Sequence, residues 1–256
     1  MTEFDYSGIP VGFYDQVARG QGSAIRKAWH LQKFQRIVDC LPRGPGLSIL
    51  DVGCFAGTFL SLLDLERFTR QLGVDILPEQ VAYANEHYGN AQREFRAIGD
   101  VSDIHNLGET FDCVTCIEVI EHLTPEIIKR LIDNVAQVLR PGGAFVLSTP
   151  NYASTWPLVE LLLNRFSDVS YEEQHITKLN AFNLEKKLAG IAPSLRTCFH
   201  LEMKTTTHLL TPFLAPLGFD AIMRLSGAVP HKSWRVPFGN LCLAVFVRNS
   251  DPAPSG

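Results

Sequence analysis

The clearest chemical feature of the chain is a glycine-bearing turn, Asp51-Val52-Gly53-Cys54-Phe55-Ala56-Gly57, between a strand-like and a helix-like segment. Such a turn places backbone N–H groups at the carboxyl edge of a sheet, where open α/β sheets bind their ligands. A pyrophosphate favours G-x-G-x-x-G, but position 55 is Phe and position 58 is Thr. The spacing therefore disfavours a dinucleotide.

Three acids accompany this turn. Asp51 lies just before the first glycine, Asp75 ends the second expected strand, and Asp100 follows the third. A carboxylate at Asp75 can accept both hydroxyls of a ribose, and one at Asp100 can meet an adenine amino group. The acids therefore predict a ligand with adenosine and positive charge but no phosphate. S-adenosylmethionine, with its sulfonium and ammonium groups, has this chemistry.

The elements that must position these residues alternate between strand and helix patterns from residue 48 onward. Strands are expected at 48–52, 70–75, 93–98, 111–119, 144–149, 194–202 and 241–248, and helices at 10–19, 23–41, 57–66, 78–87, 124–139, 156–165 and 180–189, with a broken helix at 208–225. This alternation predicts a parallel sheet covered by helices on both faces.

Four regions follow from this pattern. We expect an N-terminal helical cap at 1–46, a cofactor-binding core at 47–151, a C-terminal part of the same domain with substrate-side insertions at 152–248, and a mobile Pro/Ser/Gly-rich tail at 249–256. A length of 256 residues, 46% of them hydrophobic, suits one elaborated α/β domain.

Composition limits which classes of partner and which cellular compartment are expected for the chain. The net charge of −4 argues against extended nucleic acid as a partner. The first residues are acidic and lack an apolar signal region, so the six scattered cysteines are interpreted as reduced thiols of a cytoplasmic protein. Cys113 and Cys116 form a CxxC inside an apolar strand, which favours core positions over a redox or zinc site. No apolar run reaches membrane-spanning length.

The order of motifs resembles a known family. Leu50 to Leu60 resembles the first motif of class I methyltransferases, and the later motifs follow in order as Gly73-Val74-Asp75, Gly99-Asp100-Val101, Phe111-Asp112 through Glu118, and Leu139-Arg140-Pro141-Gly142-Gly143. The resemblance covers about residues 45–151. It implies a Rossmann-like, seven-stranded, mostly parallel sheet whose last strand is antiparallel. The departure is Phe55, where many members have Gly.

The resemblance also implies contacts with S-adenosylmethionine. Gly53 would contact the methionyl part through its backbone, Asp75 the ribose and Asp100 the adenine amino group, and Glu118 would lie near the methionyl end. The full set of expected cofactor-binding residues is Asp51, Gly53, Cys54, Phe55, Gly57, Asp75, Ile76, Asp100, Val101 and Glu118.

A second segment narrows the resemblance. Glu118-Val119-Ile120-Glu121-His122-Leu123, followed by Ser148-Thr149-Pro150-Asn151, resembles the branch that contains ubiquinone-biosynthesis O-methyltransferases and many sugar and natural-product methyltransferases. The same E-x-x-E-H pattern occurs in methyltransferases of the 2′-hydroxyl at small-RNA 3′ ends. In those enzymes a further downstream histidine helps to bind a divalent metal, and His175 is the candidate here.

A hydroxyl acceptor must lose its proton as it attacks the methyl group. His122 or His175 could act as the catalytic base, or a divalent metal could acidify the hydroxyl. The candidate ligands are Glu118, Glu121, His122 and His175, a set that suits Mg²⁺, Mn²⁺ or Fe²⁺. The structural alternative is that Glu121 and His122 only brace their loop.

The expected function is therefore S-adenosylmethionine-dependent O-methylation of a small hydroxyl compound, lipophilic or glycosylated. The alternatives are a metal-dependent 2′-O-methyltransferase of RNA 3′ ends and a non-catalytic cofactor-binding regulator.

Two parts of the chain should form the substrate side. The cap offers Tyr14, Trp29, His30 and Lys33, and the insertions are 152–177 and 205–237. Arg26 or Lys33 could pair with the cofactor carboxylate or lie on a solvated helix face. The apolar runs of the insertions could pack on the sheet, line a pocket or form a homodimer face.

Overall fold

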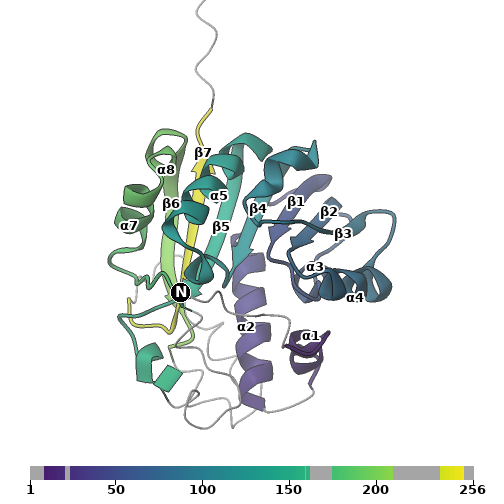
Figure 1. The fold of residues 1–256 in the computed structure, drawn as a ribbon, viewed down its shortest axis with the longest axis horizontal. Coiled ribbons are helices and arrows are strands. Elements are labelled where there is room, and N and C mark those ends of the chain that lie inside the picture. The colour runs from purple at the N-terminus through teal and green to yellow at the C-terminus, as the bar shows by residue number, and fades with distance from the viewer. Residues whose placement is uncertain (1–8, 21–23, 159, 162–174, 210–236, 251–256) are drawn as a thin grey trace, which may run out of the picture.

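A computed structural model describes residues 9–20, 24–158, 160–161, 175–209 and 237–250. One seven-stranded sheet runs through it in the order β3-β2-β1-β4-β5-β7-β6. Neighbouring strands are parallel from β3 to β5, whereas β7 is antiparallel to both β5 and β6 (Figure 1). The strands are β1 Leu47–Val52, β2 Phe68–Asp75, β3 Arg93–Ala97, β4 Phe111–Ile117, β5 Leu139–Pro150, β6 Phe199–Thr207 and β7 Leu241–Arg248. The predicted sheet, with its antiparallel last strand, is confirmed.

Helices cover both faces of the sheet. The helices are α1 Phe13–Ala18, α2 Ala24–Cys40, α3 Thr58–Ser61, α4 Pro78–Tyr88, α5 Pro125–Val138, α7 Leu184–Ile191 and α8 Ser194–Thr197, with 3₁₀ turns η2 Asp103–Leu107 and η3 Ile120–His122 and helical residues at 156–158 and 160–161. Apolar side chains of α2, α3 and α4 form one core cluster against the sheet, and those of α5, α7 and α8 form the other.

The sequence of α5 explains its place in the second layer. Thr124 caps the helix by accepting the Ile127 N–H at 3.4 Å, and Pro125 occupies the first turn. Ile128, Leu131, Ile132 and Val135 then recur at helical spacing and are fully buried on the sheet.

Several predicted boundaries were wrong for local reasons. The helix expected at 57–66 ends at Ser61, because Asp64 turns the chain by accepting the Glu66 N–H at 2.7 Å. The helix expected from 180 begins at Leu184, since the Asn180 side chain accepts the Asn183 N–H at 2.9 Å in a preceding turn.

The sixth and fifth strands also differ from expectation. The first residues of the strand expected at 194–202 instead form the short helix α8, which follows Pro193. Strand β6 begins only at Phe199. β5 begins before 144, because Leu139 already pairs with Phe111 of β4. Residues 210–225 of the expected broken helix at 208–225, and residues 162–165 of the helix expected at 156–165, lie outside the described residues.

Helix α2 connects the core to the site. Its C-terminal part packs Phe34 and Ile37, followed by Leu41 just after the helix, against one face of the sheet, next to Ile49 and Val146. Its N-terminal part continues past the lower edge of the sheet in Figure 1, beside α1. The cap residues therefore lie next to the loops that follow the parallel strands.

Two compositional predictions can be compared with this fold. Cys113 and Cys116 are free and fully buried in β4, which confirms their assignment to the core. Within the ranges that the structure describes, no helix combines the length and the apolar character needed to cross a bilayer.

Candidate cofactor and active site

The glycine-bearing loop joins β1 to α3 and uses left-handed backbone at three positions. Gly53 has φ 75°, Gly57 has φ 78°, and Phe55, although it has a side chain, has φ 47°. A Cβ on Gly53 would overlap the Val119 side chain. Glycine is therefore required there both for its left-handed backbone and because no side chain fits. Phe55 thus adopts the backbone conformation that glycine adopts more readily.

The N–H groups of this loop are occupied within the protein. Gly53 and Cys54 both donate to the carbonyl of Val74, at 2.9 and 3.0 Å, and Phe55 donates to Asp75 at 2.8 Å. A pyrophosphate cradle needs such groups to point at the ligand. The loop geometry therefore agrees with a ligand that has no phosphate.

Asp75 stands where β2 ends, beside the loop. Its Oδ2 accepts Phe55 N–H, and its Oδ1 accepts Leu77 N–H at 3.0 Å. Burial raises the pKa of Asp75, against the effect of these amide hydrogen bonds. Ile76 follows with an exposed side chain, next to the carboxylate.

Asp51 is buried in β1, two residues before Gly53. Its Oδ1 accepts the Thr115 hydroxyl of β4 at 2.7 Å. Burial raises the pKa of Asp51 to about 7, and the nearby Asp75 carboxylate adds to the shift.

Asp100 lies in the turn after β3. Its Oδ1 accepts the backbone N–H and the hydroxyl of Ser102, both at 2.7 Å, and its Oδ2 accepts Arg130 Nη2 at 2.7 Å. Although partial burial opposes it, these partners hold the pKa of Asp100 below its ordinary value. The carboxylate is thus fixed in its ionised form, while Val101 beside it is buried.

Glu118 follows β4 and reaches the cap. It has φ 52°, and its Oε2 is paired with the ammonium of Lys33 from α2. Burial opposes ionisation, but the Lys33 charge outweighs it and lowers the pKa of Glu118. Of the two expectations for Lys33, partner of a cofactor carboxylate or solvated residue, solvation is wrong, because Lys33 is buried.

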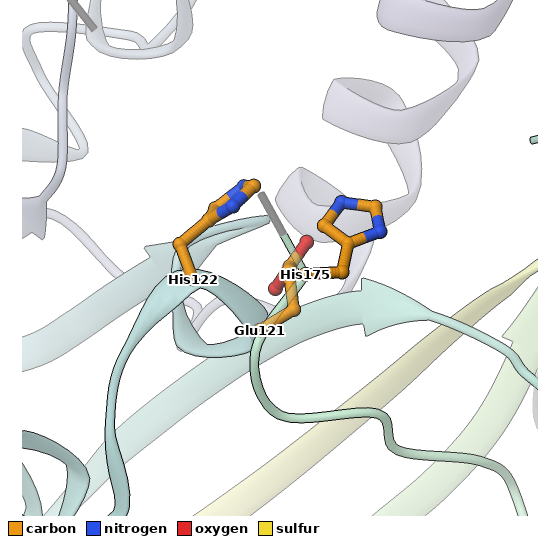
Figure 2. A group of neighbouring side chains, drawn as sticks. All are labelled: Glu121, His122 and His175. Atoms are coloured by element: carbon orange, nitrogen blue, oxygen red, sulfur yellow. The ribbon is translucent and has the colours of Figure 1, made fainter. Parts of the chain in front are cut away.

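A separate cluster of side chains includes two residues that follow Glu118 in the sequence. Glu121 and His122, in η3, face His175, and each offers a ligand atom within 4.8 Å of the others (Figure 2). The Glu121 carboxylate is 1% exposed, and neither of its oxygens has a hydrogen-bond partner among the described residues. A buried carboxylate without a partner is costly, and burial, with the nearby Glu118, raises the pKa of Glu121 to about 8. The cluster has the ligand types of a divalent-cation site.

His175 is oriented by partners that the sequence did not suggest. Its Nδ1 lies 2.7 Å from the Tyr152 hydroxyl and 2.9 Å from Glu160 Oε1. Burial lowers the pKa of His175 to about 4, so the ring is neutral at neutral pH. Metal-binding histidines are commonly held by a carboxylate on the other ring nitrogen. The only sequence signal was the acid Glu160 within an apolar run.

Comparison with known proteins decides the family. A family model described as a methyltransferase domain matches residues 26–190, more than half of the chain. The chain belongs to the class I S-adenosylmethionine-dependent methyltransferases. This confirms the family predicted from the motifs and accounts for the order of strands in the sheet.

Individual relatives of this methyltransferase are distant. The ubiquinone biosynthesis O-methyltransferase of Leptothrix cholodnii is 32% identical over 41% of this chain and 45% of its own length. A probable S-adenosylmethionine-dependent methyltransferase of Mycolicibacterium smegmatis is 29% identical over 65% of this chain and 60% of its own. The methyltransferase thus matches about half the length of these curated relatives.

A solved structure gives the same fold. The magnesium protoporphyrin IX methyltransferase of Synechocystis PCC 6803, with bound S-adenosylhomocysteine, shares a TM-score of 0.59 with this methyltransferase at 20% identity, and the match covers 93% of this chain and 94% of that one. At this identity the likeness establishes the fold alone.

The methyltransferase brings the predicted site residues together in two groups. The loop residues lie with Asp51 and Asp75, whereas Glu121, His122 and His175 cluster beyond Glu118. Of the four predicted metal ligands, Glu118 is the one that pairs with Lys33 instead. The cap approaches the first group, since Tyr14 stacks edge-on against Phe55 with ring centroids 5.1 Å apart.

Proposed function

We propose that this chain transfers the methyl group of S-adenosylmethionine to a hydroxyl of a small molecule. The family and the loop with its acids support the cofactor. The curated O-methyltransferase relatives and the buried Glu121–His122–His175 cluster support a hydroxyl acceptor. The single observation that carries the proposal is the unpartnered Glu121 carboxylate beside two imidazoles.

The cofactor would use the residues of the first group. Asp75 would offer a carboxylate to the ribose hydroxyls, Asp100, in the turn after β3, would meet the adenine amino group, and Asp51 would offer negative charge near the methionyl end. The occupied amides of Gly53, Cys54 and Phe55 keep the loop in its left-handed shape. Alignment of acceptor, methyl and sulfur supplies much of the acceleration, because a sulfonium is already a good leaving group.

The second group would handle the acceptor proton. Glu121, His122 and His175 fit a divalent cation such as Mg²⁺ or Mn²⁺, whose role would be to lower the pKa of a bound hydroxyl. Glu160 and Tyr152 would orient His175. Without a cation, His122 is the alternative base, because His175 is held with a pKa of about 4.

Aromatic rings, most of them buried, lie between the cap and the Glu121 cluster; Trp156 is 6% exposed and His208 2%. Trp156 lies 6.2 Å from His175 by ring centroids and 5.5 Å from Trp29 of the cap, and Trp29 lies 4.3 Å from His208. This row of rings leads from the cap to the Glu121 cluster. Aromatic rings can stack on flat apolar groups and on nucleobases alike, so the preference for a small acceptor over nucleic acid rests on the net charge of −4.

The test is a methyl-transfer screen with labelled S-adenosylmethionine against hydroxylated small molecules, with short RNA as a second arm. Transfer to a small hydroxyl compound that stops with EDTA and returns with Mg²⁺ or Mn²⁺ supports the proposal. Full turnover in excess EDTA rejects the cation, and transfer only to RNA rejects the small-molecule acceptor. Failure to bind S-adenosylmethionine rejects the cofactor site.

A further inference from the structure

We propose that Lys33 is a resident cation that competes with a divalent cation for Glu118. This rests on the cation site of the proposed function and adds a regulating residue to it. The observation behind it is the ion pair between Lys33, from the cap helix α2, and Glu118, the acid three residues before Glu121.

The pair is well shielded from water. The side chain of Lys33 is 6% exposed and that of Glu118 is 20% exposed. Lys33 is held from α2, whose following turns pack Phe34 and Ile37 into the core, so its position is set by the fold. Glu118 reaches it from a left-handed backbone conformation, which a residue other than glycine adopts at a cost.

The charge balance explains why the pair matters to the neighbouring cluster. Glu118 and Glu121 are two carboxylates on one loop, and only Glu118 has a cationic partner among the described residues. A cation at Glu121, His122 and His175 gains a fourth ligand if Glu118 leaves Lys33. The ammonium also repels that cation directly, because charge interactions are strong in a buried site.

Lys33 therefore sets the affinity of the site. While it holds Glu118, the cation has three protein ligands and a nearby positive charge. When it is removed, both the repulsion and the competition disappear. A purely structural role, in which the pair only fastens α2 to the loop after β4, predicts no such effect on cation binding.

The test measures Mn²⁺ binding by electron paramagnetic resonance, without substrate or turnover. Lys33→Met should lower the dissociation constant by about fivefold or more, the usual size of coupling between interacting sites. Lys33→Arg keeps the charge and should stay near wild type. Lys129→Met removes an exposed lysine of α5 and serves as the matched control.

A double-mutant cycle identifies Glu118 as the contested ligand. In the Glu118→Gln background, Lys33→Met should produce a much smaller gain in Mn²⁺ affinity. Circular dichroism and thermal melting verify that each variant folds, and Lys33→Gln replaces Lys33→Met if the latter does not.

Three results would overturn the inference. One is equal Mn²⁺ affinity in wild type and Lys33→Met, and another is an undiminished gain in the Glu118→Gln background. The third, no Mn²⁺ binding by any variant, also removes the cation from the proposed function. S-adenosylhomocysteine binding is recorded in the same samples, so that failure of the cation site is distinguished from failure of the cofactor site.

Discussion

The carboxylate of Asp75 accepts the backbone N–H of Phe55 at 2.8 Å, so the end of β2 fixes the loop that follows β1. One residue thereby shapes the loop after β1 and, in the proposed function, also receives the ribose. Parallel strands bring their carboxyl ends to one edge, which makes this double role available.

Replacement of Asp75 should separate these two roles. Asp75→Asn removes the charge that would receive the ribose hydroxyls, and hydrogen bonds to charged groups contribute about 1.5–3 kcal/mol each. We expect S-adenosylhomocysteine to bind about 10- to 100-fold more weakly by calorimetry. Asp75→Ala should weaken it further because the loop loses its anchor. Asp39→Ala, at an exposed site of α2, is the control, and unchanged affinity in Asp75→Ala would contradict the assignment.

Substitution of Gly53 distinguishes the cost of steric overlap from the cost of backbone strain. Gly53→Ala forces a Cβ into Val119 at φ 75°, whereas Gly142→Ala has nearly the same φ, 77°, with no atom within 4 Å of the new Cβ. Left-handed backbone costs an alanine about 1–2 kcal/mol at either position. Thermal melting should therefore show a larger loss for Gly53→Ala, and only that variant should lose cofactor affinity. Equal losses of thermal stability in the two variants would mean that the Val119 side chain moves aside at little cost.

The titration of Asp51 should make the free energy of unfolding depend on pH. Its pKa is about 7 in the folded protein and near its ordinary acidic value in the unfolded chain. Between those values the folded state binds the extra proton, so the free energy of unfolding falls as pH rises from about 4 to about 7. Urea unfolding across this range should show a smaller loss in Asp51→Asn than in wild type, while Glu121, whose pKa burial raises to about 8, contributes a loss to both.

Cofactor binding should respond in the opposite sense. A cationic ligand favours the ionised Asp51, so affinity for S-adenosylmethionine should rise as pH increases through about 7. Calorimetry at several pH values would measure this rise. A variant with Asp51→Asn should bind more weakly and with a flatter profile, and an equally steep profile in that variant would assign the titration to another group.

Much of this site was predictable because regular elements carry it. Asp75 and Asp100 could be placed from the periodicity of the strands before them, since residues at strand ends share one edge of the sheet. The Lys33–Glu118 pair could not, because 85 residues separate its members and only tertiary packing of α2 joins them. The orientation of His175 by Glu160 and Tyr152 depends likewise on how an irregular segment folds back.

The way in which the N-terminal cap docks on the core was likewise not predictable from the sequence. Sequence patterns predicted α1 and α2, but not the residue that docks α1. Asp15 is 1% exposed and accepts hydrogen bonds from Thr58, Tyr83 and Tyr88, at 2.9, 3.1 and 2.6 Å. An acid in a six-residue helix has no sequence pattern that reveals three distant donors.

Loss of this anchor should loosen the cap. Asp15→Ala leaves the buried Thr58 hydroxyl and two half-buried tyrosine hydroxyls without this acceptor, and an unsatisfied buried group costs about 1–3 kcal/mol. We expect a lower melting temperature and faster tryptic cleavage near Arg19. Asp39→Ala provides the control for loss of an aspartate from the cap. A variant with wild-type melting and proteolysis would show that the apolar contacts of the cap suffice.

The antiparallel strand β7 lies between β5 and β6 and pairs with both. During synthesis, neither neighbour can complete its hydrogen bonds until residues 241–248 have left the ribosome. The half of the sheet formed by β1 to β5 has no such dependence, so the loop that holds the cofactor can assemble first. Nascent chains released before residue 241 would expose the long edge of β5, which makes them targets for chaperones and proteases.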